Sequence, residues 1–98
     1  MATMQQIEAI VREVAGAQFP SAKISRVITE PGIASTGEGA VRIMIVFDDP
    51  VPHLAIGEKF LSALTDIWTR LDQIGEERMP ILRYASAHEL ETHDGPES

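Results

Sequence analysis

The chain of 98 residues contains no cysteine. It therefore has no disulfide, no thiolate metal site and no cysteine nucleophile, and its stability has to come from packing alone. No apolar run approaches the roughly 18 residues that a membrane-spanning helix needs, so we expect no membrane partner. The first eight residues lack the basic and apolar segments of a secretion signal, and a cytoplasmic location is expected.

Basic residues are also few. The chain has 8 Lys and Arg against 15 Asp and Glu, a net charge of −7. Without a large basic field, nucleic-acid binding is not expected. We expect residues 1–86 to form a single α+β domain and residues 87–98 to be a disordered acidic tail. The acidic residues of that tail are Glu89, Glu91, Asp94 and Glu97.

The densest apolar run is Val-Arg-Ile-Met-Ile-Val-Phe-Asp-Asp at 41–49. In a strand, alternate side chains point to opposite faces. One face would carry Val41, Ile43, Ile45 and Phe47, and the other Arg42, Met44, Val46 and Asp48. A strand that is fully apolar on one face and half apolar on the other belongs in the middle of a sheet, with helices on the more apolar face.

Two stretches have helical periodicity. Apolar residues recur at helical spacing over 3–16 and 54–74, and a glycine follows or ends each stretch. Thr3 and Gln6 have the spacing of a capping box at the start of the first helix. These patterns predict two amphipathic helices.

The second helix contains the single tryptophan of the chain. Trp68 lies within a wide apolar stripe of that helix, so we expect it to be largely buried against Ile43 and Ile45 of the central strand.

Residues 23–30 and 81–85 are the other predicted strands, and the glycine-rich residues 31–39 predict a mobile hairpin loop. A helix between the last two strands requires a crossover, so residues 81–85 should run parallel to residues 41–49. The predicted fold is α+β in the order α-β-β-α-β, with two helices packed on one face of a three-stranded mixed sheet. The other face is then uncovered.

Each predicted strand contributes one arginine: Arg26, Arg42 and Arg83. Strand parity places Arg42 on the uncovered face with Met44 and Val46, and the other two arginines join it if their strands bury Val27 and Leu82. Arginine among apolar residues is typical of protein interfaces. The composition indicates a non-catalytic interaction protein or accessory subunit, either a homodimer or the small partner of another protein. Ordinary cross-strand pairing of these arginines with Glu30, Glu38 or Asp48 is the alternative.

A second candidate site lies at the end of the central strand. Asp48, Asp49 and His53 are close in sequence where open sheets often bind ligands. Two carboxylates could hold Mg²⁺ through its waters with His53 as a base, which would make the chain a small ligand-binding or metal-binding domain or an enzyme. Asp-Asp-Pro is equally a turn and helix start. Because no third ligand and no activated nucleophile can be named, we predict no metal or cofactor and rank this function second.

Three short phrases carry a resemblance to known proteins: Glu-Pro-Gly at 30–32, Val-Phe-Asp at 46–48 and Arg-Met-Pro at 78–80. Across residues 23–90 the chain resembles small uncharacterised bacterial accessory proteins. The resemblance implies a stand-alone accessory protein and no particular chemistry.

Overall fold

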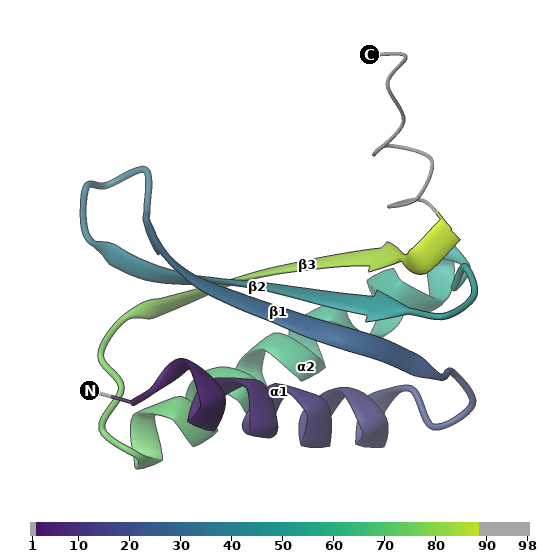
Figure 1. The fold of residues 1–98 in the computed structure, drawn as a ribbon, viewed down its shortest axis with the longest axis horizontal. Coiled ribbons are helices and arrows are strands. Elements are labelled where there is room, and N and C mark those ends of the chain that lie inside the picture. Colours follow the sequence, from purple (N-terminus) through teal and green to yellow (C-terminus); the bar gives the residue numbers. More distant parts are fainter. Residues whose placement is uncertain (1, 89–98) are drawn as a thin grey trace.

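The computed structural model describes residues 2–88, which form two helices and three strands in the order α-β-β-α-β (Figure 1). The elements are α1 Met4–Gln18, β1 Ile24–Ile33, β2 Gly39–Phe47, α2 His53–Gln73 and β3 Met79–Ser86. β2 is the central strand, antiparallel to β1 and parallel to β3, and both helices lie on one face of the sheet. The predicted α+β fold is confirmed. From residue 89 onward, the predicted acidic tail lies outside the described residues.

The hydrophobic core lies between the sheet and the two helices. The four β2 residues predicted to face the helices are each at most 1% exposed: Val41, Ile43, Ile45 and Phe47. The helices bury Ile7, Val11, Val14, Ala15, Ala63, Ile67 and Leu71 against them. Burial of each large apolar side chain is worth about 1.5–3 kcal/mol, so this layer is the main source of stability.

The first helix begins as predicted and ends later. The Gln6 N–H donates to the Thr3 hydroxyl oxygen at 3.1 Å, and the Thr3 N–H donates to the Gln6 side-chain oxygen at 2.9 Å. The helix continues through Gly16 to Gln18, where the N–H of the C-cap residue Phe19 donates to the Ala15 carbonyl. No helix of the described residues is long and apolar enough to cross a bilayer.

The hairpin between β1 and β2 is much tighter than the predicted loop at 31–39. Strand pairing continues through Pro31 and Gly32 to Ile33, which lies opposite Gly39. The Gly37 N–H donates to the Ala34 carbonyl and the Ala34 N–H donates to the Glu38 carbonyl, both at 2.8 Å. Gly37 has a φ of 91°, which glycine adopts without the Cβ clash. A glycine-rich sequence therefore forms an ordered turn, because pairing satisfies backbone groups that a loop would leave to water.

The prediction that Trp68 is buried is wrong: it is 48% exposed. α2 turns Ala63, Ile67 and Leu71 toward the core, each with no exposed surface. Successive residues of a helix are about 100° apart, so Trp68 cannot share the direction of Ile67. The apolar stripe of α2 is wider than the surface that α2 buries against α1 and the sheet. Only the residues in the middle of the stripe are therefore buried, and Trp68 lies at its exposed margin.

A buried carboxylate joins the start of the chain to the α2–β3 connection. Glu76 is 4% exposed and accepts hydrogen bonds from the Ala2 N–H at 3.1 Å and the Arg78 N–H at 2.9 Å. The Arg78 guanidinium donates two more, from Nε at 2.8 Å and Nη2 at 3.0 Å. The hydrogen bonds from the Arg78 side chain are the main cause that lowers the pKa of Glu76 from 4.5 to about 2. We call this arrangement the Glu76 clasp.

We predict that Trp68→Ala lowers the free energy of unfolding by about 1–2 kcal/mol, whereas Ile67→Ala lowers it by about 3–4 kcal/mol. The reason is that truncation of the half-exposed Trp68 creates little buried cavity, whereas truncation of the fully buried Ile67 leaves a cavity in the core. Urea denaturation of the two variants measures both losses. A larger loss for Trp68→Ala than for Ile67→Ala would contradict this orientation of α2.

We predict that Glu76→Gln lowers the free energy of unfolding by about 2 kcal/mol at neutral pH, because buried charge-assisted hydrogen bonds are lost. The folded pKa of about 2 lies below the ordinary 4.5, so the stabilisation is present above the unfolded pKa and is lost as the pH falls through about 2. Urea denaturation between neutral pH and pH 2 measures this difference. The exposed neighbour variant Glu77→Gln is the control, and a loss that does not shrink in acid would contradict the clasp.

Candidate functional site

The uncovered side of the sheet is a continuous surface made from alternate residues of all three strands. Pairing sets Met44 between Ile28 and Arg83, and Arg42 between Glu30 and Ile81. The next row has Val46 between Arg26 and Ala85. We call this surface the open face; its residues are Arg26, Ile28, Glu30, Gly32, Ala40, Arg42, Met44, Val46, Met79, Ile81, Arg83 and Ala85.

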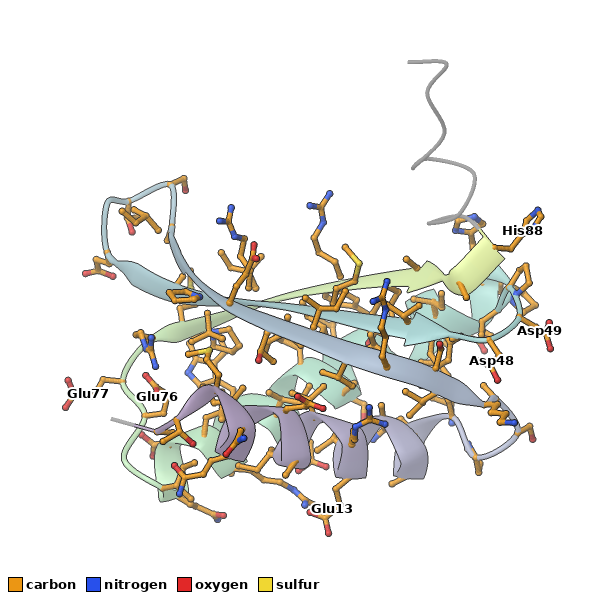
Figure 2. All side chains as sticks on the ribbon, in the orientation of Figure 1. Glu13, Asp48, Asp49, Glu76, Glu77 and His88 are labelled. Carbon is orange, nitrogen blue, oxygen red and sulfur yellow. The ribbon has the colours of Figure 1, made fainter. Side chains whose placement is uncertain are left out.

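The structure brings all three predicted arginines to the open face. Val27 and Leu82 are buried toward the helices at 6% and 7% exposed, so Arg26 and Arg83 point the other way. Figure 2 shows side chains with nitrogen tips projecting from the sheet on the side away from the helices. The only charged residues in the three strands are these arginines and Glu30, and all of them belong to this face.

One arginine is paired within the chain. Arg42 Nε lies 3.3 Å from Glu30 Oε1, with both side chains more than half exposed. Such an exposed pair contributes at most about 1 kcal/mol. The side chain of Arg42 also lies over Gly32, where an added Cβ would be 3.0 Å from Nε and 3.1 Å from Cγ. Gly32 therefore gives the guanidinium room to lie flat on the sheet.

Arg26 and Arg83 are exposed and have no ion pair among residues 2–88. Three arginines and one glutamate give the strands a net charge of +2 in a chain whose net charge is −7. The open face is thus a positive surface on an acidic protein.

The apolar part of the open face is less exposed than the sequence indicated. Met44 and Ile28 are half-buried, and they line a shallow hollow of about 210 Å³ with Glu30, Arg42 and Arg83. Val46 is fully buried although it belongs to this face. Of the two apolar residues predicted to contact a partner, Met44 is partly accessible and Val46 is not.

The predicted strand-end site is open to solvent. Asp48 has its carboxylate 3.8 Å from the Lys23 ammonium, while Asp49 and His53 are exposed. Figure 2 shows the labelled aspartates at the outer surface of the turn after β2. Within residues 2–88, no three His, Cys, Asp or Glu side chains gather closely enough to hold a metal ion. The site gains no third ligand in this part of the chain.

A larger concave feature lies beside this turn, and it includes two of the predicted site residues, His53 and Arg83. A groove of about 770 Å³ runs between the free edge of β3 and the first turns of α2. We call it the β3–α2 groove; it is lined by Phe47, Pro50, Val51, Pro52, His53, Ile56, Phe60, Leu82, Arg83, Tyr84, Ala85 and Ser86. The groove is not evident from the sequence, because its lining residues come from three separate segments of the chain.

An aromatic cluster forms the floor of the groove. Tyr84 packs against Phe19, Phe47 and Phe60 with ring centroids 5.8, 6.1 and 5.9 Å away. Its hydroxyl oxygen is buried and has no hydrogen-bond partner among the described residues. Burial raises the pKa of Tyr84 to about 12, so the hydroxyl stays protonated. A buried hydroxyl without a hydrogen-bond partner lowers the free energy of unfolding.

We predict that Tyr84→Phe leaves the free energy of unfolding unchanged or raises it by up to about 1 kcal/mol, because an unpaired buried hydroxyl is removed and the ring stays. Tyr84→Leu is the control for the ring and should cost about 2–3 kcal/mol. Thermal and urea denaturation measure both. A loss above 1 kcal/mol for Tyr84→Phe would show that the hydroxyl is hydrogen-bonded in solution.

Comparisons with known proteins add no relative from which a function could be transferred. No family model matches the chain, and no curated protein and no solved structure matches it.

Proposed function

We propose that this chain is a cytoplasmic, non-catalytic accessory protein whose open face binds another protein. The single observation that carries the proposal is the concentration of every charged strand residue on one uncovered, partly apolar face. The fold does not need arginines there, because Arg26 and Arg83 make no ion pair within residues 2–88. Arginine beside methionine and isoleucine is the composition of interface cores.

The size of the face favours a modest contact. Three strands about 4.8 Å apart and eight residues of about 3.3 Å each cover roughly 400 Å². A stable interface buries about 800 Å² on each partner, so a lasting complex also has to use the rim of the sheet, and a complex limited to the face is transient.

The charges favour an acidic partner over a second copy of the chain. Two open faces placed together bring six arginines against two Glu30 carboxylates, and each Glu30 is already paired with Arg42. Like charges in such a contact are destabilising, whereas carboxylates of another protein can pair with Arg26 and Arg83. The homodimer expected from the sequence is the second candidate, since a two-fold contact could re-pair Glu30 across the interface.

Nucleic acid is a weaker candidate for the same face. Proteins that bind single-stranded nucleic acid on a sheet stack bases on aromatic side chains. None of the open-face residues is aromatic. The net charge of −7 also opposes approach to phosphate.

The enzyme and ligand-binding alternative at Asp48, Asp49 and His53 has less support. Asp48 is engaged by Lys23, and no third metal ligand joins the aspartates within residues 2–88. A general base also needs a substrate group within reach, and nothing in the arrangement positions one.

In-cell photo-crosslinking tests the proposal. A photoreactive phenylalanine analogue replaces Ile28 on the open face, and the matched control carries it at Thr69, which is exposed on α2. We predict one discrete crosslinked protein from position 28 and none from position 69. An acidic peptide in the crosslink supports the leading candidate, and a crosslink to the chain itself supports the homodimer.

A charge at the centre of the face gives the second half of the test. Met44→Glu should reduce the crosslink from position 28 at least tenfold and leave the melting temperature within a few degrees, because Met44 is only half-buried. Thr69→Glu is the matched control. Sedimentation velocity of the purified chain reports whether any dimer dissociates in Met44→Glu. Equal crosslinking from positions 28 and 69, or a yield unaffected by Met44→Glu, would contradict use of the open face.

A further inference from the structure

The β3–α2 groove is lined by an edge strand and by a helix face, an arrangement that suits an extended peptide. Residues 82–86 are consecutive in the edge strand β3, and all of them line the groove. On the opposite wall, His53, Ile56 and Phe60 follow one another at intervals of three and four, so they share one face of α2. The groove is therefore bordered by a strand edge on one side and by a helix face on the other.

The edge of β3 is open for further pairing. Residues 79–85 make no backbone hydrogen bond beyond those to β2 among the described residues. Every second N–H and C=O group of an edge strand points away from its neighbour and can pair with another chain. The other edge is less suitable, because β1 contains Pro31 and a register shift between Ile24 and Arg26. In β3 the only proline, Pro80, lies at the far end from the groove.

The charges in the groove indicate what the peptide carries. None of the groove residues is acidic, although the whole chain has 15 Asp and Glu. Arg83 and His53 border it, and the first turn of α2 has no acidic residue and no side-chain cap. Arg83 and the backbone N–H groups of the first turn of α2 therefore favour a peptide carboxylate in this groove.

We infer that the β3–α2 groove binds an extended peptide segment that adds to β3 as a fourth strand. Alternate side chains of the segment are apolar and enter the groove over Ile56, Phe60 and Tyr84. A carboxylate of the peptide, from an acidic side chain or the C-terminus, lies near His53. Strand addition supplies the affinity through main-chain hydrogen bonds, and the groove selects the side chains. This site shares Arg83 and Ala85 with the open face but lies at the outer edge of β3, and it does not depend on the function proposed for the open face.

The probe is a phage-displayed library of random octapeptides selected against the full chain, followed by synthesis of the best-enriched peptide. We expect alternating apolar residues and at least one carboxylate in the enriched sequences. In the ¹⁵N-labelled protein, that peptide should shift the amide resonances of residues 82–86 and 53–60. A library with no enrichment, or shifts centred on the open face, overturns the inference.

Two further measurements separate strand addition from other binding. Single N-methylation along the peptide should weaken binding at least tenfold at alternate residues only, because every second N–H pairs with β3. A loss without this period of two overturns strand addition. Amidating the peptide C-terminus and replacing its acidic residues by amides, one change at a time, identifies the source of the carboxylate.

The protein variants use matched charge changes. His53→Glu should weaken binding of the peptide at least tenfold. Thr69→Glu, which also introduces a glutamate but at an exposed position of α2 outside the groove, should leave the affinity within twofold. Ile28→Glu, on the β1 side of the open face and away from the groove, should also leave affinity unchanged, so failure here and failure of the open-face proposal are distinguishable. Equal effects of His53→Glu and Thr69→Glu overturn the assignment of the carboxylate, and loss of binding in Ile28→Glu overturns the assignment of the groove.

Discussion

The structure depends on how β2 is buried. This strand is paired on both sides, and one of its faces carries four large apolar side chains that two helices cover completely. Those side chains cannot be left in water without losing most of the driving force of folding. Two helices of ordinary length cover one face of three strands and no more. The same constraint that makes the core therefore leaves the second face and both sheet edges uncovered.

The open face and the β1 edge each have features that hinder association with another copy of the chain. The open face carries all the charged residues of the strands, which hinders face-to-face stacking of copies. The β1 edge has a proline and an irregular register, both of which discourage strand addition. The part of β3 beside the β3–α2 groove has neither feature. An edge strand without such features can pair with another chain.

Two buried polar side chains show opposite treatment. Glu76 receives four hydrogen bonds, and the clasp it makes fixes the start of the chain to the turn before β3. Tyr84 has a buried hydroxyl with no partner among the described residues. A satisfied buried carboxylate is structural, and an unsatisfied hydroxyl lowers stability. The unsatisfied group belongs to a residue that lines the β3–α2 groove.

The features that depend on local periodicity could be predicted from the sequence alone. The alternation at 41–49 identified the central strand and its buried face, the capping pattern identified the start of α1, and element order required β3 to be parallel to β2. Strand parity placed Arg42 on the uncovered face, and it placed Arg26 and Arg83 there on the condition that Val27 and Leu82 are buried, as they are in the structure. These inferences succeed because a period of two or 3.6 residues is a property of neighbours in the chain.

The remaining features could not be predicted from the sequence, because each depends on contacts between residues that are distant in the chain. The orientation of Trp68 was decided by where α2 meets α1 and the sheet, which a wide apolar stripe leaves open. The Glu76 clasp joins Ala2 to a residue 74 positions away, and Glu76 resembled an ordinary surface acid. The groove exists because the end of β3 and the start of α2 come together in space. Packing sets these distances, and no local pattern encodes them.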